Sequence, residues 1–303
     1  MAAVPDPSPA APLFERLLVV GIGLIGGSLL RRAMLDPAIA RTVVAYDADA
    51  AVRSRARELA LAHDIPDAIA DAARGADAVV LCVPVGAMAA AAAAVMPHLP
   101  PGAVLSDVGS TKQSVIREVA PLLRPDIDFV PAHPLAGTEH SGPDSGFPTL
   151  FESRWSIVVP APDASQAAVS RVESLWRRCG SMTCRMDPSH HDRTLAIVSH
   201  LPHLIAFTIC GTADDLEGET RAEVLRFAAS GFRDFTRIAA SDPTMWRDVF
   251  LNNRDALLEM LARFTEDAQA MARAIRWGDE DYIVERVERG RRIRRGLIEN
   301  RQA

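Results

Sequence analysis

Short apolar runs alternate with helix-length segments over the first 187 residues of the chain. The runs are apolar throughout, without the polar alternation of a half-exposed strand. They therefore predict a parallel sheet whose two faces are covered by helices, as in a doubly wound α/β domain. The predicted strands are Leu17–Val20, Thr42–Tyr46, Ala78–Val83, Val104–Val108, Phe129–Pro131, Ser156–Val159 and Met182–Met186.

The strand pattern ends near Asp187, and helical periodicity replaces it. Asp187 and Asp242 each precede a proline, a combination typical of a helix N-terminus. Residues 252–276 carry apolar side chains at a spacing that makes one helix face, namely Leu257, Leu258, Leu261 and Phe264. The sequence predicts an α/β domain over residues 13–187 and an all-α domain over residues 188–303, with a ligand cleft between them. Residues 1–12 lack the charged and apolar regions of a signal peptide and are expected to be a disordered tail.

Composition narrows the choice of partners. The net charge of −6 argues against a nucleic-acid-binding surface, which needs a basic field. The arginine-rich stretch at residues 285–301 is interleaved with glutamate, so we expect a solvated helix there and not an RNA- or membrane-facing patch. Residues 78–97 are apolar, but Pro84 and Gly86 divide them into a strand and a helix too short to span a membrane.

The four cysteines do not form a disulfide framework, so a reducing cytoplasm is the expected compartment. Cys179 and Cys184 could bind zinc together with His190 or His191, but the paired C-x-x-C spacing of a zinc site is missing. We therefore expect no metal.

A glycine-rich turn joins the first predicted strand to a helix. The string Gly21-Ile-Gly23-Leu24-Ile25-Gly26 has the G-x-G-x-x-G spacing of a Rossmann-type dinucleotide site, in which the helix N-terminus binds pyrophosphate. Asp47 follows 26 residues after Gly21, at the end of the second strand, where a carboxylate accepts both ribose hydroxyls and repels a 2′-phosphate. The turn predicts NAD as the cofactor in preference to NADP. A glycine turn that binds no nucleotide is the alternative.

Two further strand ends border the same crevice, because ligands of open α/β sheets bind outside the carboxyl ends of the strands. The first carries Val83 and Pro84, and the second carries the string Asp107-Val-Gly-Ser-Thr-Lys112. Lys112 is the single lysine among 33 basic residues, which genomic composition alone could explain. Its place at a strand end predicts a contact with the cofactor.

Candidate substrate residues come from both predicted domains. His133 follows a strand, and a neutral imidazole there can accept a hydrogen bond from a substrate alcohol. Arg237 lies between apolar residues, so we expect it to need a carboxylate, either from Asp234 or Asp242 or from a ligand. His200 and His203 share a helix face, where they could line a pocket or simply be core or capping residues.

Together these strings resemble the prephenate/arogenate (cyclohexadienyl) dehydrogenase family. Besides the glycine turn, they are Asp107–Lys112, His133–Glu139, Ser199–His203, Phe235–Ala239, Ser241–Pro243 and Trp246–Asp248, and the similarity spans residues 13–295. The resemblance implies NAD-dependent oxidation of a ring alcohol with loss of the ring carboxylate as carbon dioxide, on the way to tyrosine. It also implies an anionic substrate and a homodimer formed by the helical domain.

The resemblance also implies roles for single residues. His133 matches the histidine that hydrogen-bonds the ring hydroxyl, and Ser110 matches a serine beside it and the nicotinamide. Arg237 matches the arginine that binds a substrate carboxylate, while Glu139 and His203 match pocket residues. The choice between prephenate and arogenate is left open.

Two other functions are compatible with the architecture. A 3-hydroxyacid or imine reductase would share it, but residues 189–208 contain no lysine of the kind that donates a proton in hydroxyacid enzymes. A catalytically silent NAD-binding sensor would not need both His133 and Arg237.

Overall fold

The computed structural model describes residues 11–216, 223 and 226–299, so most of the predicted N-terminal tail lies outside the described residues. The chain forms two compact units, Met1–Arg254 and Asp255–Ala303. The boundary predicted after Asp187 lies inside the first unit, at the point where strands give way to helices.

The first unit contains a five-stranded parallel sheet with the order β2-β1-β3-β4-β5. Its strands are β1 (Phe14–Val20), β2 (Ala40–Tyr46), β3 (Ala78–Leu81), β4 (Val104–Asp107) and β5 (Asp128–Phe129). The expected Rossmann-type sheet is confirmed in these five strands, and their apolar side chains are buried on both faces.

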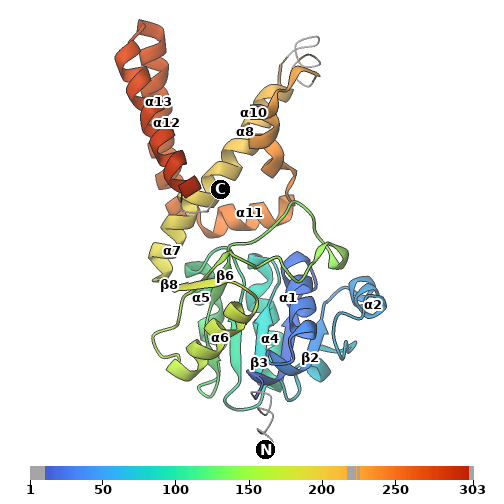
Figure 1. Cartoon of the computed structure of the whole chain (residues 1–303). Helices are drawn as coiled ribbons and strands as arrows, with labels where there is room; N and C mark the ends of the chain where they lie inside the picture. The colour runs from blue at the N-terminus through green and yellow to red at the C-terminus, as the bar shows by residue number, and fades with distance from the viewer. Residues whose placement is uncertain (1–10, 217–222, 224–225, 300–303) are drawn as a thin grey trace, which may run out of the picture. The chain divides into compact units, whose positions relative to one another are not determined.

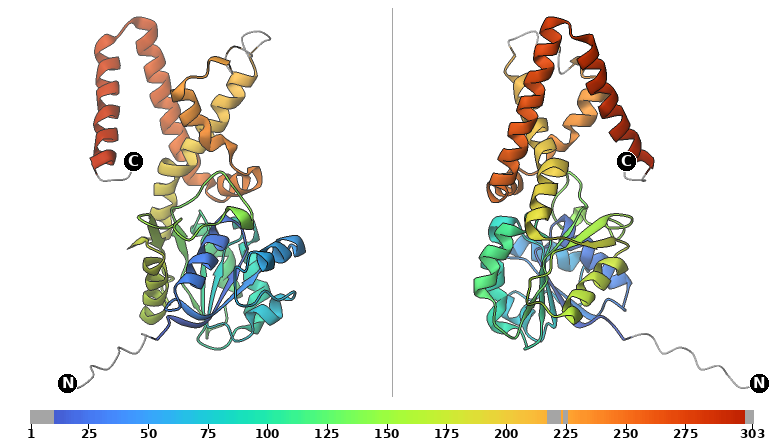
Figure 2. Two further views of the ribbon diagram at one scale, coloured as in Figure 1. Left: turned by 45° about the vertical axis from the view of Figure 1, so that its right-hand side comes forward. Right: turned by 90° about the vertical axis from the view of Figure 1, so that its left-hand side faces the viewer.

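Helices cover both faces of this sheet, as the right-hand view of Figure 2 shows. Alternate residues of β1 divide between two cores, since Leu17 and Val19 belong to one apolar cluster, and Leu18 and Val20 to the other. The first cluster includes α1 (Leu24–Leu35) and α6 (Gln166–Arg178). The second includes α3 (Ile69–Ala73), α4 (Met88–Val95) and α5 (Gln113–Val119). Helix α2 (Ala50–Glu58) follows β2.

The last three strands form a separate sheet, which corrects the expectation of one continuous parallel sheet. They are β6 (Ala132–Pro134), β7 (Trp155–Val158) and β8 (Met182–Arg185), and β6 runs antiparallel to β7. The chain changes sheets at Pro131: the Val130 N–H still donates to Leu105 O, whereas Pro131 has no N–H and its carbonyl accepts from Val159. His133 therefore lies within a strand of the second sheet and not in a loop beyond the first.

From residue 188 onward the described part of the chain is helical (Figure 1). Its elements in the first unit are α7 (Pro188–Leu195), a π-helical turn (Ala196–His200), α8 (Leu201–Asp214), α10 (Ser230–Thr236), a 3₁₀ turn (Arg237–Ala240) and α11 (Pro243–Asn252). Both predicted helix starts are confirmed, because the Asp187 and Asp242 carboxylates accept N–H groups of the first turns of α7 and α11.

The continuous helix Pro188–Asp214 is long and apolar enough to cross a membrane by length and composition alone. However, its polar residues His191, Asp192 and His200 are buried and hydrogen-bonded to other parts of the first unit. These three polar side chains therefore have partners within the first unit, while 28% of the most apolar 18-residue window of the helix is buried.

The second unit consists of α12 (Arg254–Trp277), whose first residue belongs to the first unit, and α13 (Glu280–Glu299). Both helices expose large apolar side chains in the single chain: Leu258, Phe264, Ile275, Trp277, Val284, Val287, Ile293 and Leu297. The predicted apolar face of the first of these helices is thus only partly covered, since Leu257 is buried whereas Leu258 and Phe264 are exposed. Such a surface is typical of helices that pack against another chain.

Candidate active site

The glycine-rich turn between β1 and α1 has the packing of a dinucleotide site. A Cβ on Gly21, whose φ is +96°, would lie 2.5 Å from the Cys82 carbonyl oxygen, and a Cβ on Gly26 would lie 1.9 Å from the carbonyl oxygen of Gly21. A Cβ on Gly23 would meet no described atom within 4 Å. Two glycines are therefore required by packing, and the third keeps open the space in front of the helix.

The amino end of α1 is available for an anionic group. No side chain caps the helix at Gly23, so the first-turn amides of Leu24, Ile25 and Gly26 have no capping side chain. Asp47 lies directly after β2, and its carboxylate accepts the Ile22 N–H at 2.8 Å, which ties it to the glycine turn. These residues fit the pyrophosphate and ribose of a dinucleotide.

The carboxyl end of β3 meets the helical part of the first unit. Val83 is half-buried and Pro84 is exposed directly after this strand. Two residues further on, the Gly86 N–H donates to Asp248 of α11 at 3.2 Å, and a Cβ on Gly86 would lie 2.7 Å from the Asp248 carboxylate. Helix α11 thus packs at the edge of the sheet where a dinucleotide would bind.

Lys112 corrects a prediction. Its side chain is completely buried, and its ammonium donates to Asp107 and, at 2.7 Å, to the carbonyl oxygen of Ala132. Burial lowers the pKa of Lys112, while the Asp107 carboxylate opposes this shift. Since the ammonium is enclosed by protein groups, it does not contact a cofactor. It joins the end of β4 to the start of β6, one residue before His133.

His133 is the first member of a buried chain of hydrogen bonds. Its Nδ1 lies 2.9 Å from Nε2 of His191, and Nδ1 of His191 lies 2.8 Å from the Asp192 carboxylate. Asp192 also accepts the main-chain N–H groups of Lys112 and Gln113 at 2.7 and 2.9 Å. Strand β6, helix α7 and the amino end of α5 are therefore joined at this point.

The electrostatic environment keeps both imidazoles neutral. Burial lowers the pKa of His133 well below its ordinary value, and neighbouring His191, Lys112 and His200 lower it further. Burial also lowers the pKa of His191, which its hydrogen bond to Asp192 only partly opposes. For Asp192, burial raises the pKa, but the hydrogen bonds it accepts outweigh burial and the pKa is lowered. The arrangement is thus a carboxylate bound to the neutral ring of His191, which in turn contacts the neutral ring of His133.

The π-helical turn positions His200. At about 100° per residue, a regular α-helix would place a residue nine positions after His191 on its opposite side. The wider turn rotates His200 back toward the buried face, where Asn253 Nδ2 bridges its Nδ1 and the Asp192 carbonyl oxygen. Burial lowers the pKa of His200 to about 4. The main chain of Ser110 approaches this ring, although Nε2 makes no hydrogen bond of ordinary geometry.

His203 and Arg237 lie on the helical side of the site. The His203 ring stacks on Trp246 with the ring centres 3.8 Å apart, and its Nδ1 donates to the Ser199 carbonyl. Burial lowers the pKa of His203, and the charge of Arg237 lowers it further. Arg237 Nη1 donates to Glu139 at 3.4 Å.

The contact with Glu139 corrects one expectation about Arg237. The Arg237 side chain is 61% exposed in the single chain, so it is not a buried cation, and its carboxylate partner is Glu139 instead of Asp234 or Asp242. Glu139 follows His133 by six residues, so the same segment supplies both His133 and the partner of Arg237. The site residues predicted from the two halves of the sequence are therefore joined by direct contacts.

Sequence reasoning missed His191, Asp192 and Asn253 as site residues. His191 entered only as a possible zinc ligand. In the structure it is committed to His133 and Asp192, and Cys179 is buried in the apolar core beside Trp176. Among the described residues no group of three histidine, cysteine or acidic side chains could hold a metal ion. The sequence feature that could have identified His191 and Asp192 is a histidine followed by an aspartate, one turn after the predicted start of a helix.

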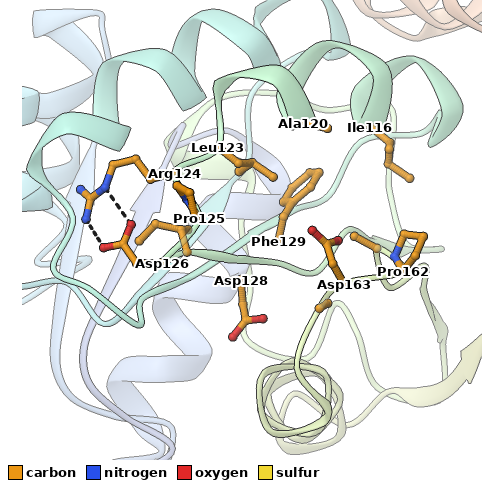
Figure 3. A pocket seen from close by; sticks show the side chains of 13 residues that line it. Ile116, Ala120, Leu123, Arg124, Pro125, Asp126, Asp128, Phe129, Pro162 and Asp163 are labelled. Atoms are coloured by element: carbon orange, nitrogen blue, oxygen red, sulfur yellow. Dashed lines mark hydrogen bonds and ion pairs between the residues drawn. The ribbon is translucent and has the colours of Figure 1, made fainter.

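A surface hollow lies elsewhere on the first unit (Figure 3). It has a volume of about 520 Å³ and is lined by residues 123–129 and 161–164 together with Ile116 and Ala120. Two of its polar groups are engaged with each other, Arg124 with Asp126, and Asp128 accepts from Ser165. No predicted site residue lines it, and it borders the start of β5, away from the carboxyl ends of the strands.

Comparison with known families identifies the family and the fold of the chain. A model of the prephenate dehydrogenase nucleotide-binding domain matches residues 30–184, and a model of the prephenate dehydrogenase dimerization domain matches residues 187–289. The chain belongs to the prephenate dehydrogenase family. The protein is accordingly a dehydrogenase that catalyses an oxidative decarboxylation in tyrosine biosynthesis.

The alignments with individual relatives extend over nearly the whole chain. The chain is 40% identical to the cyclohexadienyl dehydrogenase of Zymomonas mobilis over 94% of its own length and 97% of that protein. It is 29% identical to the prephenate dehydrogenase of Bacillus subtilis, covering 93% of this chain and 76% of that protein. The crystal structure of prephenate dehydrogenase from A. aeolicus with hydroxyphenyl propionate and NAD+ superposes with a TM-score of 0.86 at 28% identity, covering 96% and 99% of the two chains.

Proposed function

We propose that this enzyme oxidises prephenate, arogenate or both with NAD+, and that His133, Ser110 and Arg237 act on the substrate. The observation that carries the proposal is the 133–139 segment, which supplies a buried neutral imidazole and, through Glu139, reaches Arg237. When bound, NAD+ supplies the hydride acceptor for the ring carbon that bears the alcohol. The A. aeolicus structure with NAD+ and hydroxyphenyl propionate supports both the cofactor and the aromatic product class.

The protein residues have three tasks in this reaction. His133 accepts the hydrogen bond of the ring alcohol, which strengthens as the carbinol carbon loses hydride. Arg237 binds a substrate carboxylate, since its contact with Glu139 uses only one of five guanidinium N–H groups. The helices that carry His200 and His203 orient the ring between these groups.

Variants of His133 and Arg237 separate the chemical step from binding. We expect His133→Asn to lower kcat at least 100-fold with little change in KM, and Arg237→Gln mainly to raise KM for the substrate. Formation of NADH from prephenate and from arogenate, followed by absorbance, measures both parameters and shows which substrate is accepted. Near-normal turnover of His133→Asn would remove this residue from the chemistry.

Preference for NAD over NADP is proposed from the ribose end of the site. The negative charge of Asp47 would repel the 2′-phosphate of NADP. The next arginine in the sequence, Arg53, is already bound to protein groups. Arg53 Nη1 donates to the carbonyl oxygens of Asp47 and Ala48, and its Nε contacts Asp67. We expect Asp47→Ser to raise KM for NAD at least tenfold and to weaken discrimination against NADP. Asp49→Ser, which removes a nearby carboxylate that caps α2, is the matched control.

A homodimer formed by the helical part is proposed together with this function. The dimerization-domain match and the exposed apolar side chains of α12 and α13 support it. Sedimentation at micromolar concentration tests it, and a stable monomer with full activity would refute it. A cytoplasmic location completes the proposal, because a biosynthetic dehydrogenase uses the intracellular NAD pool.

A further inference from the structure

The hydrogen-bonded chain formed by His133, His191 and Asp192 is enclosed by protein. His191 and Asp192 have no exposed surface, and His133 is 8% exposed. The three side chains come from β6 and α7, and the carboxylate is bound by the main chain at the start of α5. Each contact along the chain is 2.8 or 2.9 Å long, within the range of ordinary hydrogen bonds.

The positions of the protons along this hydrogen-bonded chain follow from its Asp192 end, where the donors are known. Main-chain N–H groups can only donate, so the Asp192 carboxylate accepts from Lys112 and Gln113. The ionised carboxylate must also accept from His191, whose Nδ1 therefore carries the proton. In the neutral His191 ring Nε2 is then an acceptor, so Nδ1 of His133 must donate to it. The remaining nitrogen of neutral His133, Nε2, is left with a free lone pair.

We propose that His191 and Asp192 are positioning residues that fix the tautomer of His133, so that Nε2 always presents a lone pair to the substrate alcohol. This inference rests on the proposed function of His133. In the opposite tautomer Nε2 would carry a proton and could donate but not accept.

The same hydrogen-bonded chain stabilises the positive charge that His133 gains during the reaction. As the carbinol carbon loses hydride and the ring carboxylate leaves as carbon dioxide, the electron pair of the breaking C–C bond makes the ring aromatic. The alcohol proton moves toward Nε2 of His133 and returns to the oxygen of the phenol, so no proton is released overall. While it is shared, the Nδ1 proton of His133 moves toward His191, which brings the positive charge next to Asp192. Lys112 and His200, the other charged or titratable neighbours of His133, do not hydrogen-bond to its ring.

Two nearly isosteric variants test the proposal. Asp192 Oδ1 accepts from both Lys112 N–H and His191, so in Asp192→Asn the amide NH2 can donate to Nδ1 of His191 only in the orientation that gives up the Lys112 contact. That orientation reverses both tautomers and protonates Nε2 of His133. We expect kcat to fall at least about 100-fold with KM changed less than threefold, as for a histidine held in the wrong tautomer. In His191→Gln the amide oxygen can still accept the Nδ1 proton of His133, so we expect kcat to stay within about tenfold of the parent. His190→Gln, an exposed neighbour on the same helix, is the control.

A direct readout needs neither substrate nor turnover. Nitrogen-15 NMR of the histidine rings in the full-length protein reports which nitrogen carries the proton. We expect His133 protonated at Nδ1 in the parent and in His191→Gln, and at Nε2 in Asp192→Asn. Circular dichroism and urea unfolding show whether Asp192→Asn is folded, because Asp192 also binds the start of α5.

Either of two results would overturn the proposal: an Nε2–H tautomer of His133 in the parent protein, or a folded Asp192→Asn variant in which His133 is protonated at Nε2 while kcat stays within threefold of the parent. Failure of the proposed function gives a different result. In that case the parent oxidises neither prephenate nor arogenate, while the NMR tautomers can still be as expected.

Discussion

Replacing Lys112 by methionine tests the structural role of the single lysine. The ammonium is enclosed by Asp107 and the carbonyl oxygen of Ala132, and neither ion of the pair has any exposed surface. Methionine retains most of the side-chain volume but leaves the Asp107 carboxylate buried with only the Gly109 N–H as a donor in the described structure. The cost is therefore that of an uncompensated buried charge.

The expected loss of unfolding free energy in Lys112→Met follows from this environment. Breaking a buried pair by removing one partner costs about 3–5 kcal/mol, and the loss of a donor to the Ala132 carbonyl adds about 1 kcal/mol. With an m-value of about 3 kcal/mol/M in urea, the unfolding midpoint is expected to fall by more than about 1 M. In Asp107→Asn/Lys112→Met both charges are removed, and the amide oxygen can still accept from Gly109. We expect this double variant to recover about half of the loss.

Urea unfolding followed by tryptophan fluorescence measures these changes, because Trp176 lies in the core of the same unit. Arg41→Met, which breaks the exposed pair with Glu15, is the control and should leave the midpoint unchanged. KM for NAD should stay within about twofold in the folded Lys112→Met variant. An unchanged midpoint combined with a tenfold higher KM for NAD would refute the structural account and restore the cofactor role.

Two further predictions concern packing and pH. In Gly146→Ala the new Cβ would lie 2.7 Å from the main-chain carbon of Gly27 beside the glycine turn, so we expect a loss of about 1–3 kcal/mol in unfolding free energy and weaker NAD binding by calorimetry. Gly137→Ala, which meets no described atom, should be neutral, and equal stability of the two variants would contradict this reasoning. His200 is held neutral with a pKa of about 4, so the unfolded chain takes up protons first as pH falls below about 6.5, and ~3 kcal/mol of stability is lost by pH 4. Urea midpoints between pH 7 and 4 measure this loss, which should be smaller in His200→Gln; a flat profile in the parent would exclude it.

Features that depend on neighbouring residues could be predicted from the sequence. The positive φ of Gly21 and the close approach of Gly26 to the Gly21 carbonyl arise within a turn of six residues, and the start of α7 is capped by a carboxylate next to its first turn. Alternation of apolar runs and helix-length segments predicts the parallel sheet for the same reason, since burial on both faces leaves a local pattern in each strand.

Features that depend on which segments meet could not be predicted. Pro131 ends one strand and allows the next to join another sheet, but only the position of β7 makes this switch visible. Lys112 follows a strand end, as a cofactor residue would, and its role was decided by the Asp107 and Ala132 groups that enclose it.

In the site, too, some features depend on neighbouring residues and others on tertiary contacts. His133 and Arg237 are candidates for substrate residues because the short strings that contain them resemble those of a known family. The contacts of His191 with His133, of Asp192 with the start of α5, and of Arg237 with Glu139 join residues 58, 80 and 98 positions apart. Residue type and spacing specify what a side chain can donate or accept, whereas the tertiary fold decides its partner, because hydrogen bonds and ion pairs form only between groups that packing brings within about 3 Å.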